Sequence, residues 1–221
     1  MDLVNFLLIY DKTIVYEKND IDKGKTPPLI YEICSCLREA FCLSYAIRKN
    51  NNIYLYFKDT SGLIKFQGNK LKYLGPDERS QALLLLKAQN KIKVAKLQES
   101  NGWIKSTPGI YVKKCKNILS FVQSEMCDPN EVKLFIIHNQ LASTLIELQN
   151  FKNNNFFYTP KTLSFIMSKN DLNLEVFLEL TNYHEINVIR FGSVKKLNDQ
   201  ILLLNFIKDR ISEVRVKNNI T

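Results

Sequence analysis

Two short segments carry side chains whose types and spacing suit binding or catalysis. In the first, Gly75-Pro76-Asp77-Glu78-Arg79, a proline followed by two acids is typical of the start of a helix. A helix start accounts for Asp77 and Glu78 but does not require Arg79. That guanidinium either pairs with an acid of the same turn or is available to a ligand.

The second segment runs from Trp103 to Lys114 and holds the only tryptophan, a Pro-Gly turn and three lysines. One interpretation is an irregular loop anchored by a half-buried Trp103. The other is an RNA-contacting loop, in which lysines bind phosphates and Trp103 or Tyr111 stacks on a base. Composition alone leaves both interpretations open.

Most familiar catalytic motifs are absent from the chain. It has seven glycines and contains no G-x-G-x-x-G, Walker, G-x-S-x-G or H-E-x-x-H pattern. The two histidines have no partner at a diagnostic spacing, and His184 is interpreted as a surface loop residue. The five cysteines are odd in number, so we expect small buried thiols in a reducing compartment, with no disulfide framework and no zinc site.

The elements that must position these segments are predicted from apolar periodicity and turn residues. Strands are predicted at Leu3–Tyr10, Ile53–Phe57, Leu63–Phe66, Val132–Ile137, Thr162–Met167 and Ile186–Phe191. Helices are predicted at Leu29–Arg48, from Pro76 toward Ala95, and at Ile118–Val122, Leu141–Leu148, Leu172–Leu180 and Val194–Ile211. Loops are predicted at Glu17–Pro28 and Asn150–Asn155.

The last two-fifths of the chain therefore reads as an alternation of strand and helix. Such alternation favours a mostly parallel sheet covered by helices. Ligands of such sheets bind beyond the carboxyl ends of the strands, which here are Met167–Asp171 and Phe191–Val194.

Length and charge limit the class of protein. The chain has 221 residues, 45% of them hydrophobic, and a formal net charge of +9, which favours polyanionic partners. Its apolar runs are too short to cross a membrane, and its first residues lack the pattern of a signal peptide. We expect one domain over residues 1–221.

Several segments, in order, resemble the archaeal tRNA pseudouridine-54 N1-methyltransferases of the SPOUT superfamily. The resemblance covers about Leu29 to Lys114. It rests on Ile33–Cys36, Ala40–Ser44 with Ile47-Arg48, Lys65–Gly68, Gly75–Arg79 and Ser106–Val112.

The resemblance implies an α/β knot with a C-terminal trefoil knot at about residues 160–215, a cytoplasmic homodimer, and S-adenosylmethionine-dependent methyl transfer to tRNA. For that reaction Asp77 and Glu78 are candidate bases, with Arg79 on a phosphate or on the cofactor carboxylate. Cofactor candidates are Met167, Ser168, Phe191, Gly192, Ser193 and Leu197. RNA-binding candidates are Arg48, Trp103, Lys105, Ser106, Thr107, Tyr111 and Lys113.

The chain also departs from the family pattern in three places. An Arg-x-Asp pair at the start of the first long helix is replaced by Pro28–Glu32, and Ser35 replaces a later arginine. The glycine-rich first knot loop is replaced by Met167–Asp171, and the terminal-helix stretch reads Val194–Gln200. The alternative interpretation is a catalytically degenerate relative that binds RNA or a partner protein.

Overall fold

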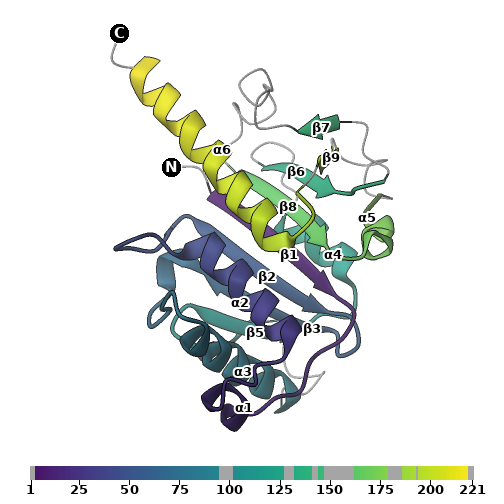
Figure 1. The fold of residues 1–221 in the computed structure, drawn as a ribbon. Coiled ribbons are helices and arrows are strands. Elements are labelled where there is room, and N and C mark those ends of the chain that lie inside the picture. Colours follow the sequence, from purple (N-terminus) through teal and green to yellow (C-terminus); the bar gives the residue numbers. More distant parts are fainter. Residues whose placement is uncertain are drawn as a thin grey trace.

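The nine strands of the described chain form one mixed sheet (Figure 1). The computed structural model describes residues 3–94, 102–126, 132–140, 144–146, 162–178, 186–192 and 194–218. The strand order is β4-β5-β3-β2-β1-β8-β6-β9-β7. The strands are β1 (Leu3–Tyr10), β2 (Asn51–Phe57), β3 (Gly62–Gln67), β4 (Ile104–Thr107), β5 (Ile110–Lys114), β6 (Val132–Ile137), β7 (Thr144–Ile146), β8 (Thr162–Ser168) and β9 (Ile186–Phe191).

The centre of the sheet is parallel because its strands are apolar on both faces. β1 pairs in parallel with both β2 and β8, with Leu7 opposite Tyr54 on one side and Ile166 on the other. Strands buried on both faces are typical of parallel sheets. Five of the eight strand pairings are parallel, and β2–β3, β3–β5 and β4–β5 are antiparallel. The prediction of a mostly parallel sheet is confirmed.

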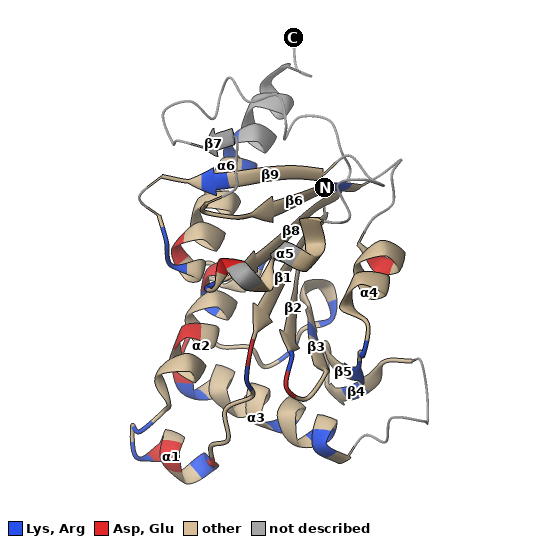
Figure 2. Ribbon diagram, turned by 90° about the vertical axis from the view of Figure 1, so that its right-hand side faces the viewer, with Lys and Arg blue, Asp and Glu red and all other residues tan. Residues whose placement is uncertain are grey.

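Helices cover both faces of the sheet (Figures 1 and 2). Alternate residues of β1 point to opposite faces, so Phe6 and Leu8 join one buried cluster while Leu7 and Ile9 join the other. The larger cluster lies under α1 (Lys18–Asp22), α2 (Pro28–Phe41), α3 (Glu78–Val94) and α6 (Leu197–Asn218). The smaller lies under α4 (Ile118–Glu125) and α5 (Glu175–Leu178). Short 3₁₀ turns, η1 (Gly68–Lys70) and η4 (Asp171–Asn173), complete the elements.

A buried amide network fixes α6 against α2 and β2. The Asn51 side chain donates to Ala40 O at 2.7 Å and to Asn205 Oδ1 at 2.9 Å. The Asn205 side chain in turn donates to Glu39 O at 2.9 Å. Both asparagines are 1% exposed or less, so each of these bonds replaces a bond to water. The network therefore holds the third turn of α6, around Asn205, against the C-terminal end of α2.

Most of the predicted elements are confirmed. All six predicted strands are present with ends within two residues, as is the helix predicted after Pro76. The helix predicted at Ile118–Val122 is present as α4 but ends three residues later, at Glu125. The closing helix is present as α6 but begins at Leu197 and extends to Asn218. Asn150–Asn155, His184, Ser193 and Cys127 lie outside the described residues.

Two predictions in the first part of the chain were wrong in extent. The loop predicted at Glu17–Pro28 contains α1, whose start is held by the Glu17 backbone N–H donating to Asp20 Oδ2. The helix predicted at Leu29–Arg48 ends at Phe41. There the chain turns back, because Leu43 N donates to Ala46 O and Arg48 N donates to Phe41 O.

The remaining corrections concern elements with weak or mixed periodicity. Trp103–Lys114 is not an irregular loop but the hairpin β4–β5. Its turn needs Gly109, since φ is +81° and a Cβ there would lie 2.4 Å from the Leu71 backbone. The helix predicted at Leu141–Leu148 contains β7, and the one at Leu172–Leu180 is reduced to η4 and α5 in its described part. No helix of the described chain is long and apolar enough to cross a membrane.

We expect Asn205→Ala to lower the free energy of unfolding by about 1–3 kcal/mol, because it strips partners from buried groups of Asn51 and Glu39. Asn90→Ala is the matched control, because Asn90 also lies in a helix but is exposed. Both variants gain the higher helix propensity of alanine, but Asn90→Ala loses no buried hydrogen bond. Urea unfolding of both variants measures the difference. Equal effects of the two substitutions would show that the amide network does not hold α6.

Candidate functional site

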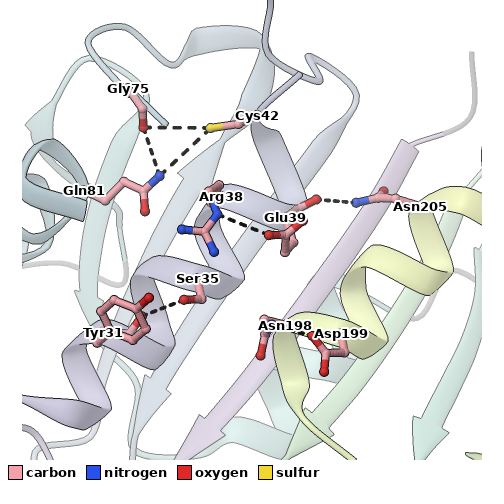
Figure 3. Close-up of polar contacts among 10 residues, drawn as sticks. All are labelled: Tyr31, Ser35, Arg38, Glu39, Cys42, Gly75, Gln81, Asn198, Asp199 and Asn205. Carbon is pink, nitrogen blue, oxygen red and sulfur yellow. Dashed lines mark hydrogen bonds and ion pairs between the residues drawn. The ribbon is translucent and has the colours of Figure 1, made fainter. Parts of the chain in front are cut away.

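A pocket of about 670 Å³ opens between the N-terminal half of α2 and the start of α6. It lies at the edge where β6 and β8 end, which is the edge at which parallel α/β sheets bind ligands. Figure 3 shows part of α2 on one side and the first residues of α6 across from it. The lining residues are Pro28, Tyr31, Glu32, Ser35, Arg38, Asn139, Lys169, Lys195, Lys196, Leu197 and Asn198.

The wall formed by α2 follows from the period of the helix. Ile30, Ile33 and Leu37 are fully buried against the sheet. The positions between them, Tyr31 and Arg38 among them, therefore fall on the other side and line the pocket. Pro28 lies in the first turn, where its missing N–H costs no helical bond.

The pocket is predominantly cationic. Its lining includes Arg38, Lys169, Lys195 and Lys196, against the single carboxylate of Glu32. Lys169 Nζ pairs with Glu32 Oε2 at 3.1 Å, and Arg38 Nε pairs with Glu39 Oε1 at 3.2 Å. Lys195 and Lys196 are exposed and make no ion pair with the described residues. Figure 2 shows their connecting segment between β9 and α6 in blue.

One buried acceptor in this pocket has no protein donor. Glu32 Oε1 is shielded from solvent and has no hydrogen-bond partner among the described residues. The other oxygen of the same carboxylate is the one that Lys169 engages. An unmatched buried acceptor costs about 1–3 kcal/mol, so its presence beside a pocket indicates a donor supplied by a ligand.

The loop after β8 is held by side-chain hydrogen bonds. Ser168 Oγ donates to Ile9 O at 3.0 Å and accepts from Asn173 Nδ2 at 3.1 Å. Asp171 accepts from the backbone and the side chain of Asn139, both at 3.1 Å. These bonds tie the ends of β1, β6 and β8 together without a glycine in the loop.

The predicted cofactor residues lie around this edge with different exposures. Leu197 lines the pocket, and Gly192 is exposed just after β9. The side chains of Met167 and Phe191 face the core and are at most 1% exposed, so only their backbone is available to a ligand. Ser168 is buried in the loop network, and Ser193 lies outside the described residues.

The predicted catalytic residues lie at the start of α3 and do not line the pocket. Asp77 accepts the Ser80 backbone N–H at 2.8 Å, and this bond lowers the pKa of the Asp77 carboxyl. Arg79 pairs with Asp22 at 2.9 Å. Glu78 is the first residue of the helix. These contacts match the helix-start interpretation of the motif.

The predicted RNA contacts divide between two places. Arg48 makes two hydrogen bonds to Asp209 of α6, at 2.8 and 2.6 Å, so its guanidinium holds the terminal helix. Lys105, Ser106 and Thr107 lie on β4, and Tyr111 lies on β5; of these, Lys105 is exposed.

Trp103 is partly buried and packs against the smaller core cluster. Its ring contacts Tyr54 and Phe121, with centroids 6.2 Å away in each case. Lys65 and Lys113 lie over it at 5.5 and 4.6 Å, and Lys113 also pairs with Glu125. Burial lowers the pKa of Lys65. A ring enclosed in this way supports the interpretation of Trp103 as an anchor.

The cysteines are unsuited to nucleophilic chemistry. Cys34 and Cys36 are buried on α2, and burial raises the pKa of the Cys34 thiol to about 12. Burial also raises the pKa values of Cys36, Cys42 and Cys115. The described cysteines are all unpaired, and no cluster of three potential metal ligands occurs among the described residues.

Sequence reasoning missed the residues that line most of the pocket. Glu32 was noted only as part of a stretch that departs from the family, and Lys169, Lys195 and Lys196 were not singled out. The available signals were the polar side of α2 and the polar residues after each strand of the late alternation.

Residues 29–126 match a family described as "Putative SAM-dependent RNA methyltransferase". Three archaeal relatives are each called tRNA (pseudouridine(54)-N(1))-methyltransferase. The protein of Methanocaldococcus jannaschii is 39% identical over 37% of this chain, and one of Methanococcus maripaludis is 36% identical over 57%. That of Methanococcoides burtonii is 25% identical over 93% of this chain and 96% of its own length. The more similar alignments are shorter, and cover 42% of the Methanocaldococcus protein and 59% of the Methanococcus protein.

Proposed function

We propose that the chain, which is similar to the archaeal tRNA (pseudouridine(54)-N(1))-methyltransferases, is an S-adenosylmethionine-dependent tRNA methyltransferase. The proposed reaction transfers a methyl group to N1 of pseudouridine in the T-loop. The observation that carries the proposal is the pocket at the carboxyl ends of β6 and β8, walled by the matched helix α2.

The residues present fit S-adenosylmethionine. A volume of about 670 Å³ is in the range of small-molecule sites. Tyr31 and Leu197 offer apolar surface for adenine, and Asn139 offers an amide. Lysines at the rim suit the carboxylate of the cofactor, and Gly192 lets the chain approach without a Cβ. When bound, the cofactor supplies an electrophilic methyl group.

Arg38, Lys195 and Lys196 suit the RNA backbone. They border the pocket, and the two lysines are free of ion pairs within the described chain. Phosphate contacts of this kind orient a nucleic acid without reading its sequence. We propose that they bind the phosphates beside the target nucleotide, and that the β4–β5 hairpin, with exposed Lys105, is a second contact.

The remaining proposals concern assembly. We propose that residues 1–221 form one SPOUT-like domain with a trefoil knot at about 160–215, and that the protein acts as a cytoplasmic homodimer. The support for a dimer is Leu202 and Phe206, one turn apart on α6 and 51% and 41% exposed. Apolar side chains exposed together on a helix favour burial against a partner.

A degenerate, non-catalytic relative is the second candidate. It is favoured by the loop Met167–Asp171 after β8, which contains no glycine where the family's first knot loop is glycine-rich. Such a protein would retain the cationic rim and bind RNA without methyl transfer.

For the methyltransferase we expect calorimetric titration with S-adenosylmethionine to give micromolar binding. Incubation of the protein with radiolabelled cofactor should then methylate tRNA that carries pseudouridine at the T-loop position. The same tRNA with uridine there is the control and should stay unlabelled, since uridine has no free N1–H. A folded protein that binds RNA but not the cofactor would favour the degenerate relative.

For the RNA contact we expect Lys195→Ala/Lys196→Ala to weaken tRNA binding about tenfold or more and to make its salt dependence shallower by roughly 1–2 units in log–log slope. Lys105→Ala/Lys116→Ala removes the same charge from exposed positions on and beside the hairpin, the proposed second contact, and should weaken binding less. Filter binding across a salt series measures both. A larger loss in the hairpin variant would place the main contact there instead.

For the dimer we expect Leu202→Glu/Phe206→Glu to sediment as a monomer, because charges there oppose burial of the α6 surface. Val94→Glu, at an exposed position of α3, should leave the dimer intact. A wild-type protein that sediments as a monomer at micromolar concentration would contradict the dimer.

A further inference from the structure

Glu32 is the only carboxylate among the residues that line the pocket. Its side chain is 23% exposed, and its two oxygens have unequal surroundings. Oε2 is held by the Lys169 ammonium at 3.1 Å, whereas Oε1 is buried and lacks a donor among the described residues. One oxygen is therefore held by Lys169, and the other can accept a hydrogen that no described residue supplies.

Other carboxylates near this part of the fold are already engaged. Asp171 accepts two hydrogen bonds from Asn139. Glu39 pairs with Arg38, and Asp77 accepts the Ser80 N–H at the start of α3. None of these three lines the pocket. Of these four carboxylates, Glu32 alone lines the pocket and has an oxygen without a hydrogen-bond donor among the described residues.

We propose that Glu32 is the general base of the reaction, with Oε1 accepting the N1 proton of the target pseudouridine. This inference rests on the proposed function. As N1 forms its bond to the methyl carbon, the carbon–sulfur bond breaks and sulfur keeps the electron pair. The N1 proton passes to Oε1, so Glu32 ends the step as a neutral carboxylic acid. A base within hydrogen-bond reach contributes about 10²–10⁴ in rate.

Lys169 positions the base. Its ion pair fixes the carboxylate through Oε2 and leaves Oε1 directed to a ligand. Lys169 follows β8 directly, so the base on α2 is tied to the loop in which cofactor contacts are expected. The surrounding cations also stabilise the negative charge that develops on the uracil ring as the proton leaves.

Several titratable and charged groups surround the Glu32 carboxylate. Lys169 faces the carboxylate from the loop after β8, and Tyr10 of β1 and Cys36 of α2 are close enough to interact with it electrostatically. The other charged groups of the pocket are Arg38, Lys195 and Lys196.

The test is Glu32→Gln, which keeps size and removes the basic oxygen. We expect kcat for methyl transfer to fall at least about 100-fold, while the dissociation constants for S-adenosylmethionine and tRNA change less than threefold. We also expect the acid limb of the kcat/KM–pH profile to disappear. Glu32→Asp should recover part of the rate and restore that limb. Glu39→Gln, on the same helix but outside the pocket, is the matched control and should stay within threefold of wild type.

Four results would overturn the assignment. An active wild type whose Glu32→Gln variant keeps its rate would exclude Glu32, and a large loss in Asp77→Asn or Glu78→Gln would move the base to α3. Loss of cofactor affinity in a Glu32→Gln protein with wild-type melting behaviour would make Glu32 a binding residue instead. A folded wild type without cofactor binding or methyl transfer would overturn the proposed function, and the base with it.

Discussion

The docking of α6 on α2 is the constraint on which the pocket depends. The last helix is distant in sequence from α2, yet its first residues form the wall opposite Glu32 and Arg38. Buried amides of Asn51 and Asn205 join the two helices to β2, and Arg48 reaches Asp209 from the loop before β2. Because the Asn51 and Asn205 amides are buried, a shift of α6 would leave them without hydrogen-bond partners. These contacts therefore hold α6 beside α2, the two helices that line the pocket.

The cations and the carboxylate of the pocket suit two different kinds of ligand group. Cations at the rim suit the phosphates of RNA, and one carboxylate inside suits a proton or a hydrogen-bond donor. The ion pair between Lys169 and Glu32 joins the two, since it places a cation from the β8 loop on an acid from α2. A uniformly basic surface would bind polyanions without positioning any one atom. The buried oxygen of Glu32, which has no hydrogen-bond donor among the described residues, gives this pocket one defined position at which a ligand can donate a hydrogen bond.

Sequence reasoning succeeded where apolar runs decide the structure and failed where distant contacts do. The late strands β6, β8 and β9 were predicted correctly because each is a short apolar run followed by polar residues, whereas β7 was predicted as part of a helix. The same pattern predicts a ligand edge after β8 and β9. The β4–β5 hairpin was missed because its lysines and Pro108-Gly109 resemble a loop, whereas its pairing with β3 is a contact with an earlier part of the chain. Glu32 was missed for a related reason: nothing local reveals that α2 and the start of α6 enclose it.

The divergent loop after β8 is compatible with a working site. Glycine in such a loop lets backbone approach a ligand, and its loss would matter most if the loop were then free to adopt other conformations. Here Ser168 bonds Ile9 and Asn173, and Asp171 bonds Asn139, so the loop is fastened to three neighbouring strand ends. The loop also contributes Lys169 to the pocket. Polar side-chain hydrogen bonds therefore hold this loop, and it places Lys169 at the pocket where a glycine-rich loop would allow close backbone approach.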